Sequence, residues 1–94
     1  MDAKVQDNPD GHRFEIIVDG ELGGFAAYRL RDGVVVITHS EVDPAYQGQG
    51  VGGELVRQTL DQLRERGATV VPACPFFAAY LRKHHEYDDI IAGD

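Results

Sequence analysis

The spacing of apolar residues changes from that of strands to that of a helix at the segment EVDPAYQGQGVGGELV, which spans residues 41–56. Before the segment, apolar residues alternate with polar ones, a pattern typical of half-buried β-strands. After it, they recur at the spacing of an amphipathic helix. The segment itself holds four glycines, two glutamines and one proline. A strand therefore runs through a glycine-rich connection directly into a helix, and this junction constrains the fold more than any other feature.

Three strands are predicted ahead of this junction. They span residues 12–18, 21–30 and 34–42, and the turns at Gly20 and Gly33 between them have the chemistry of tight hairpins. Alternation assigns one buried face to each of the first two strands. The residues on these faces are Phe14, Ile16 and Val18, and then Leu22, Ala26, Tyr28 and Leu30. The first half is expected to form an antiparallel meander.

The second half predicts a helix, a strand and a helix. The first helix has one apolar face from Val51 onward, and Gly67 ends it in the usual C-terminal manner. The residues of this face are Leu55, Val56, Thr59, Leu60 and Leu63. A short apolar strand at 69–71 follows, and Pro75 starts the second helix, PFFAAYLRKHH. The order β-β-β-α-β-α indicates an α/β (α+β) fold, in which a right-handed crossover makes the last strand parallel to strand 34–42.

Chain length and local composition set the domain boundaries. With 94 residues, the chain supports one small domain. Residues 1–11 are polar, lack apolar periodicity and carry Pro9 and Gly11, so a mobile tail is expected there and a domain over residues 12–94. The segment YDDIIAGD at 87–94 is expected to add a short strand at most.

Charge and cysteine content narrow the partners and the compartment. A formal net charge of -7 repels polyanions, so neither nucleic acid nor an anionic membrane is an expected partner. No apolar run is as long as a membrane span. Cys74 is the single cysteine, which precludes an internal disulfide and fits a reducing compartment. A cytoplasmic protein is therefore expected.

The glycines of the junction suit an anion-binding loop. They are Gly48, Gly50, Gly52 and Gly53. The first N–H groups of a helix lack internal partners and carry partial positive charge, and glycine removes the side chains that would keep a phosphate away from them. A turn without a ligand is the alternative. A nucleotide phosphate loop is a poor match because no Gly-Lys-Ser/Thr follows, and a dinucleotide fingerprint fits badly because the glycines follow an antiparallel meander.

Two motifs carry a resemblance to a known family. QGQGVG at 47–52 is similar to the Q/R-x-x-G-x-G/A signature of the GNAT acetyltransferase superfamily, in which this loop holds the pyrophosphate of acetyl-coenzyme A. More narrowly, THSEVDPAYQGQGVGGELV together with VVPACPFFAAYLRKHHEY resembles the small single-domain GNAT-like acetyltransferases. The resemblance covers residues 12–88.

The resemblance implies a minimal GNAT fold that binds acetyl-coenzyme A as cosubstrate, with no metal. The residues implied in binding are Val42, Gln47, Gly48, Gln49, Gly50, Val51, Gly52, Gly53 and Cys74. A full GNAT domain has two helices after its first strand and a further C-terminal hairpin, whereas here a direct turn at Gly20 is expected and the chain ends soon after the second helix. Those parts usually help to shape the acceptor pocket. The acceptor side is therefore expected to be very open or completed by a partner chain.

Direct attack of an amine on the thioester requires a base, a donor for the developing oxyanion and an acid for the leaving thiolate. Alternation divides strand 34–42 into two faces. One face carries Val35, Ile37, His39 and Glu41, and the other carries Thr38 and Ser40. Glu41 or His39 is the candidate base, and solvated strand residues without a catalytic role are the alternative. By resemblance, the backbone N–H of Val42 is the candidate oxyanion donor.

Cys74 is expected directly ahead of the second helix, where the helix dipole favours a thiolate. A small buried hydrophobic side chain is the simpler interpretation. By resemblance to the small family, the thiol is expected to contact the coenzyme thiol, to form a covalent acetyl-enzyme, or to form a mixed disulfide with coenzyme A.

Neither an acid nor a metal site is assigned. Many GNAT domains carry a Phe-Tyr pair on the second helix, but Tyr80 precedes Leu81 here, so its hydroxyl is displaced by one residue, and Tyr87 is no better supported. His84 and His85 are adjacent and point in different directions, and no second cluster has ligand spacing.

The sequence therefore predicts an N-acetyltransferase that moves acetyl from acetyl-coenzyme A to an amine by direct attack in a ternary complex. Transfer through Cys74 is the second route. A non-catalytic acyl-coenzyme A binding or sensing module is an alternative function, and an interaction protein in which the glycines form only a turn is another. The acceptor, a small molecule or a protein, stays open, and the protein is expected to be a monomer or a weak homodimer.

Overall fold

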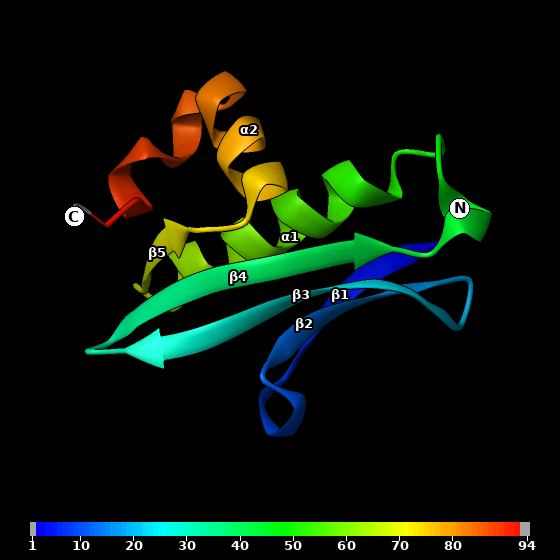
Figure 1. Ribbon diagram of the computed structural model, residues 1–94, viewed down its shortest axis with the longest axis horizontal. Helices are drawn as coiled ribbons and strands as arrows, with labels where there is room; N and C mark the ends of the chain where they lie inside the picture. Colours follow the sequence, from blue (N-terminus) through cyan, green and yellow to red (C-terminus); the bar gives the residue numbers. More distant parts are fainter. Residues whose placement is uncertain (1, 93–94) are drawn as a thin grey trace.

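The computed structural model describes residues 2–92, which form a five-stranded sheet with its helices on one face (Figure 1). The strands are β1 (Ala3–Asn8), β2 (Arg13–Val18), β3 (Glu21–Arg31), β4 (Val34–Val42) and β5 (Thr69–Pro72), and the helices are α1 (Val51–Glu65) and α2 (Pro75–Lys83). Short 3-10 turns lie at Pro9–Gly11 (η1), Pro44–Tyr46 (η2) and His85–Ile90 (η3). The strands follow chain order, with β1 to β4 antiparallel and β5 parallel to β4. The predicted meander with a parallel strand and two helices is confirmed.

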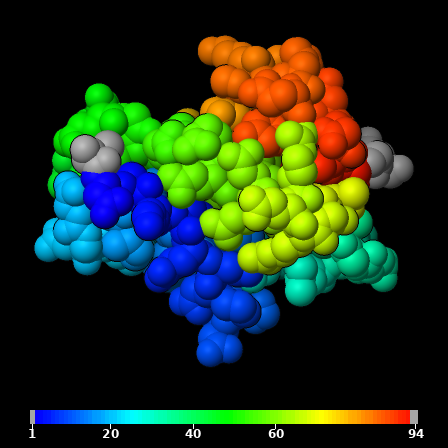
Figure 2. All heavy atoms as spheres, turned by 180° about the vertical axis from the view of Figure 1, so that it is seen from behind, coloured from blue at the N-terminus to red at the C-terminus, as the bar shows by residue number. Residues whose placement is uncertain are grey.

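The first residues of the chain form an edge strand, so the expected mobile tail at 1–11 is wrong for residues 3–8. This strand, β1, pairs antiparallel with β2 along its whole length. Only Val5 of β1 is buried, which is why apolar periodicity did not reveal it. The space-filling view shows β1, in dark blue, lying against α1, in green (Figure 2). The folded domain therefore begins before residue 12, while Met1 lies outside the described residues.

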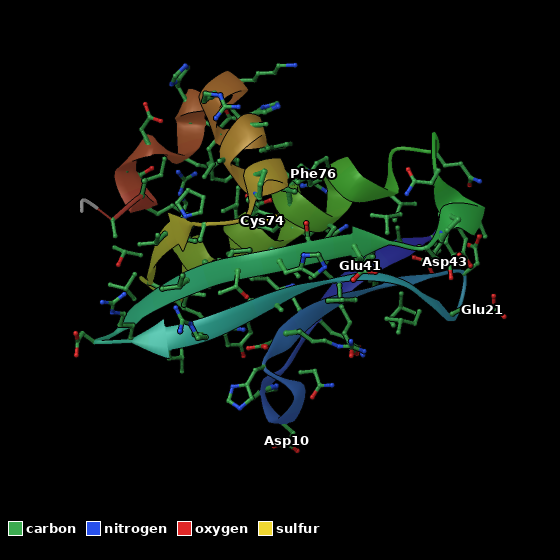
Figure 3. The ribbon with its side chains drawn as sticks, viewed as in Figure 1. Asp10, Glu21, Glu41, Asp43, Cys74 and Phe76 are labelled. Atoms are coloured by element: carbon green, nitrogen blue, oxygen red, sulfur yellow. The ribbon has the colours of Figure 1, made fainter. Side chains whose placement is uncertain are left out.

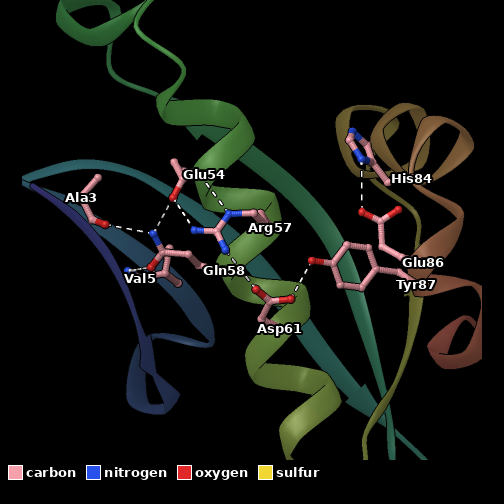
Figure 4. Close-up of polar contacts among 9 residues, drawn as sticks. All are labelled: Ala3, Val5, Glu54, Arg57, Gln58, Asp61, His84, Glu86 and Tyr87. Atoms are coloured by element: carbon pink, nitrogen blue, oxygen red, sulfur yellow. Dashed lines mark hydrogen bonds and ion pairs between the residues drawn. The ribbon is translucent and has the colours of Figure 1, made fainter. Parts of the chain in front are cut away.

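Two glutamines of α1 cover the outer edge of β1. The Val5 N–H donates to Gln58 Oε1 at 2.9 Å, and Gln58 Nε2 donates to the Ala3 carbonyl at 2.9 Å (Figure 4). Gln62 Nε2 donates to the Val5 carbonyl at 2.7 Å. An uncovered edge strand presents free backbone groups that template pairing with other chains. The two glutamine side chains therefore form the hydrogen bonds that a further strand would otherwise make with this edge of β1.

A buried tyrosine provides a second link to β1. Tyr28 on β3 donates its hydroxyl to Asp7 Oδ1 at 2.8 Å, and Arg66 pairs with the other carboxylate oxygen of Asp7 at 2.9 Å. Burial, and then the hydrogen bond to Asp7, raise the pKa of Tyr28 to about 12. The hydroxyl therefore remains a donor at neutral pH, and β1 is joined to both the sheet and the end of α1.

The predicted buried faces of β2 and α1 are confirmed. Their buried residues are Phe14, Ile16 and Val18 in β2 and Leu55, Val56, Thr59, Leu60 and Leu63 in α1. Both predicted hairpin turns form, with Gly20 at φ 87° and Gly33 at φ 81°, and Gly67 at φ 70° follows the end of α1. No helix in the described part of the chain is both long enough and apolar enough to cross a membrane.

β3 departs from simple alternation at Gly23, which is an extra residue between two consecutive pairs with β2. The bulge turns Leu22 to the helix-free face of the sheet, where it is 47% exposed. Leu30 is 68% exposed near the turn of the β3–β4 hairpin, which projects beyond the helices in Figure 1. Ala26 and Tyr28 are buried as predicted, but the prediction that Leu22 and Leu30 share their burial is wrong.

β4 contains a second bulge, at Thr38, which is an extra residue between two consecutive pairs with β3. Beyond Thr38 the two faces of the strand exchange. Ser40 pairs with buried Ala26 and lies on the helix side, whereas His39 and Glu41 lie on the helix-free side. The prediction that His39 and Glu41 continue the buried face of the first half of the strand is therefore wrong, although they do share one side.

The segment after α2 adds a single bridge rather than a strand. Ile91 forms an isolated parallel bridge to Val70, and the Ala92 N–H donates to the Val70 carbonyl at 2.8 Å. Residues 93–94 lie outside the described part of the chain. Tyr87 of η3 fastens this segment to α1 by donating its hydroxyl to an Asp61 carboxylate oxygen at 2.6 Å (Figure 4).

Replacement of Gln58 by alanine tests the cover over β1. Gln58→Ala removes the side-chain partners of the Val5 N–H and the Ala3 carbonyl, so we expect the free energy of unfolding to fall by about 1 to 2 kcal/mol. Glu65→Ala, at an exposed position of the same helix, is the control and is expected to change it by less than about 0.5 kcal/mol. Urea unfolding measures both, and equal effects would contradict the bridging role of Gln58.

Candidate functional site

A hollow of about 390 Å³ lies where the end of β4 meets the beginning of α1. Its walls are residues 40–42 of β4, residues 46–48 and 50–53 of the loop and the first turn of α1, and Phe76 of α2. We call it the loop hollow. Most residues of the strand-to-helix junction at 41–56 therefore line this one cavity.

The loop hollow exists because β4 and β5 separate. Their parallel pairing ends at Ile37 and Pro72, after which the Cys74 N–H donates to the Ile37 carbonyl at 2.9 Å and the chain turns into α2. Among the strands of residues 2–92, β4 continues to Val42 with a neighbour only on its β3 side. The Asp43 N–H donates to β3, so alternation directs the backbone groups of Val42 away from β3 and toward the hollow.

The first turn of α1 provides free space and polar backbone groups. The N-cap residue Gly50 has φ 80° and, in the described chain, no side chain caps the helix. Gly48 also has a positive φ, 79°. A Cβ atom added at Gly48, Gly50 or Gly53 would meet nothing within 4 Å. An anion can therefore approach the first N–H groups of α1, where the positive end of the helix dipole favours it.

The two glutamines of the loop have different positions. Gln47 lines the loop hollow, and its Nε2 donates to the Val42 carbonyl at 3.2 Å, which holds the loop against β4. Gln49 is not among the lining residues, and its Nε2 donates to the Ala45 carbonyl at 3.2 Å. The side chain of Gln49 therefore makes a hydrogen bond inside the loop and does not face the hollow.

Phe76 covers part of the first turn of α1. A Cβ at Gly52 would lie 2.9 Å from Phe76 Cζ and 3.6 Å from Val42 Cγ2, so only glycine allows this approach. The Phe76 ring is 47% exposed, and Figure 3 shows it with Cys74 on the helix side of β4. Phe76 and Tyr46 both line the hollow, and neither was a candidate from the sequence, in which they read as ordinary aromatic residues.

Cys74 lies beside the loop hollow without lining it. It is the N-cap residue of α2 and is 3% exposed. Its Sγ lies 3.2 Å from Oγ of Ser40, which does line the hollow. Sequence analysis missed Ser40 because the bulge at Thr38, which turns Ser40 to the helix side, leaves no periodic signal.

His39 and Glu41 form an exposed pair on the helix-free side. His39 Nε2 lies 2.8 Å from Glu41 Oε2, and both side chains are about 60% exposed. Glu41 also lines the loop hollow and is its only charged lining residue among those the structure describes. A phosphate in the hollow therefore meets backbone amides rather than lysine or arginine.

The two tyrosines considered as acids lie outside the loop hollow. Tyr80 stacks on His84 with ring centroids 3.9 Å apart, and burial, and then the charge of Glu86, raise its pKa. Tyr87 donates to Asp61, and burial and this hydrogen bond raise its pKa. Neither is among the lining residues. Within residues 2–92 no three His, Cys, Asp or Glu side chains gather as a potential metal-binding group.

A family model described as GCN5-related N-acetyl-transferase matches residues 13–90 of the chain. The chain belongs to this family. Streptothricin acetyltransferase of Streptomyces lavendulae is 37% identical to it over 70 residues, which cover 71% of the chain and 37% of that relative. The chain thus spans little more than a third of this GCN5-related relative.

Solved structures of the GCN5-related family share the fold. A GCN5-like protein of Staphylococcus aureus superposes with a TM-score of 0.71 at 25% identity, covering 97% of this chain and 89% of that one. The ribosomal-protein-S18-alanine N-acetyltransferase of Escherichia coli gives a TM-score of 0.59 at 28% identity, covering 76% and 48%. The first strand is β1, which leads into the 3-10 turn η1, so the expectation that the turn at Gly20 follows the first strand is wrong.

Gly53 offers a test that separates binding from stability. Gly53 has a regular helical backbone and open space around its missing Cβ, so Gly53→Ala is expected to raise the free energy of unfolding by about 0.5 to 1 kcal/mol. The same methyl group enters the loop hollow, so the affinity for coenzyme A is expected to fall. Urea unfolding and calorimetric titration measure the two effects, and a more stable variant with unchanged affinity would contradict the role of Gly53 in the hollow.

The pair Gly50 and Gly33 isolates the effect of the loop backbone. Both have φ near 80°, so alanine at either position costs about 1 to 2 kcal/mol of stability. Only Gly50 lines the loop hollow, whereas Gly33 lies in the distant β3–β4 turn. Coenzyme A affinity is expected to fall for Gly50→Ala alone. Equal affinities of the two variants would show that the loop conformation is unimportant for binding.

Proposed function

We propose that this protein transfers an acetyl group from acetyl-coenzyme A to an amine, by direct attack in a ternary complex. The observation that carries the proposal is the uncapped, glycine-lined start of α1 facing the free edge of β4. The helix start suits the phosphates of a long cosubstrate, and the free strand edge suits a chain that carries amide groups. Membership in the GCN5-related family supports it.

In this proposal the pyrophosphate occupies the glycine-rich part of the loop hollow, against the amides of residues 48–53. The pantetheine arm follows the free edge of β4, where the backbone groups of Val42 face the hollow, and Phe76 packs on it. The thioester lies toward Ser40 and Cys74. The Val42 N–H is the proposed donor to the oxyanion that develops on the carbonyl.

Glu41 is the proposed base, with His39 as its partner. The amine loses its proton to the carboxylate, directly or through a water molecule, as its nitrogen bonds to the acetyl carbon. The carbon–sulfur bond then breaks, and coenzyme A leaves as a thiolate that takes a proton from water. Tyr80 and Tyr87 do not line the hollow, and the hydroxyl of Tyr46, which does line it, donates to Glu21. The hydrogen bond from His39 holds the Glu41 carboxylate on the acceptor side of β4.

Transfer through Cys74 is the second candidate route. The Ser40 hydroxyl 3.2 Å from the Cys74 sulfur lies on the wall of the loop hollow, so a small rearrangement exposes the thiol to the thioester. The thiolate would displace coenzyme A and form an acetyl thioester, which the amine then attacks. The 3% exposure of Cys74 favours the direct route.

A coenzyme-binding or sensing module is the alternative function, supported by the positions of Tyr80 and Tyr87, which do not line the loop hollow. The names of the relatives, one referring to streptothricin and another to the alanine of ribosomal protein S18, leave both small-molecule and protein acceptors open. A monomer or weak homodimer in the cytoplasm is part of the proposal.

Incubation with acetyl-coenzyme A, followed by intact mass and thermal unfolding, tests the proposal. We expect a rise in melting temperature without a stable mass increase, and turnover with an amine panel. Glu41→Gln is expected to lower kcat/KM about a hundredfold or more at unchanged coenzyme affinity, whereas Glu65→Gln, on the exposed side of α1, retains activity.

The other outcomes distinguish the alternatives. An acetyl adduct that disappears in Cys74→Ala would establish the covalent route. Binding without turnover across a broad panel would favour the sensing module. Without any coenzyme binding, the proposed function fails as a whole.

A further inference from the structure

We propose that the acceptor binds in a second hollow, on the helix-free face of the sheet, and that it is a small primary amine on an apolar body without an anionic group. The hollow has a volume of about 230 Å³ and is lined by residues 22–25 of β3 and residues 41–44 at the end of β4. We call it the strand-end hollow. The inference rests on the proposed function and names its substrate class.

The strand-end hollow and the loop hollow lie on either side of the same stretch of β4. Glu41 and Val42 line both of them. Figure 3 shows Glu41 on the side of β4 opposite Cys74 and Phe76, in agreement with the strand register. An amine in the strand-end hollow therefore lies next to the proposed base and to Val42, the proposed oxyanion donor, which both also line the loop hollow.

The walls of the strand-end hollow are apolar. The Gly23 bulge turns Leu22 into it, and Leu22 remains 47% exposed. Phe25 and Pro44 add further apolar surface, and Gly24 brings β3 so close to β4 that a Cβ there would lie 2.5 Å from the Glu41 carbonyl oxygen. These groups suit an aromatic ring or a short aliphatic chain.

Both charged residues that line the strand-end hollow in the described part of the chain are acidic. Glu41 and Asp43 line it, and no lysine or arginine does so among the described residues. The Asp43 carboxylate also accepts the Ala45 N–H at 2.9 Å, which fixes it at the end of β4. Two carboxylates attract an ammonium group and repel a carboxylate. A free amino acid is therefore a poor acceptor, although it carries the same amine.

The volume of the strand-end hollow limits the size of the acceptor. Pockets for drug-sized ligands begin at about 300 Å³, so 230 Å³ suits a body of one ring or a short chain. Phenethylamine has the required ring, spacer and amine. Free phenylalanine has the same ring and amine with an added carboxylate, and serves as the matched probe of charge.

Nuclear magnetic resonance of the isotope-labelled protein with saturating coenzyme A tests the acceptor site without requiring turnover. Phenethylamine is expected to shift the backbone amide signals of residues 22–25 and 41–43, and free phenylalanine is expected to shift them at least about tenfold less at equal concentration. If these signals do not move with phenethylamine, or move equally with both probes, the acceptor site is wrong.

Two exposed leucines on β3 offer a matched pair of variants. Leu22→Arg places a cation in the strand-end hollow and is expected to raise the KM for phenethylamine about tenfold, with kcat and coenzyme A affinity retained. Leu30→Arg makes the same change at the far end of the strand and is expected to leave the KM unchanged.

The two proposals fail separately. If amines are acetylated but Leu22→Arg and Leu30→Arg behave alike, the proposed function stands and the acceptor site falls. If no amine is acetylated, the proposed function falls, and the amide signals alone decide whether the strand-end hollow binds phenethylamine.

Discussion

The separation of β4 from β5 beyond Ile37 and Pro72 is the constraint on which the candidate site depends. Up to that point the two strands form a continuous parallel ladder inside the core. Beyond it, β5 turns into α2 at Cys74, and β4 runs on to Val42 paired with β3. Its backbone groups on the other side then face the loop hollow instead of another strand. A bound molecule can occupy the position of the missing neighbour, so the same feature that interrupts the sheet creates a place for a ligand.

The bulge at Thr38 determines which side chains lie on each face of this end of β4. If the strand alternated regularly through Thr38, Glu41 would face the helices and Ser40 would face away. With the bulge, Ser40 lies beside Cys74 on the helix side, and Glu41 pairs with His39 on the open side. A one-residue change of register moves every later side chain to the other face. The base candidate therefore lies on the open side of the sheet because the strand is irregular.

Much of this fold was predictable from the sequence, and the failures share a cause. The helix of residues 51–65 and the glycine loop carry strong local signals, namely one apolar face and a cluster of residues free to adopt positive φ. A bulge carries none, because it shifts alternation without changing composition, and so the faces of Leu22 and Glu41 were misjudged. β1 was missed for another reason. It is stabilised by Gln58 and Gln62, far away in sequence, rather than by an apolar pattern of its own.

The charge distribution around β4 explains how an acidic protein can serve two ligands of opposite charge. On the helix side, the anion-binding groups are backbone amides and a helix dipole, which add no net charge and need no lysine. On the other side, Glu41 and Asp43 contribute full negative charges at the strand-end hollow. A lysine-lined phosphate site so close to these carboxylates would pair with them and weaken both sites. Amides cannot be neutralised in this way, so a glycine loop suits the proposed pair of ligands, an anionic cosubstrate and a cationic acceptor in two hollows that share Glu41 and Val42.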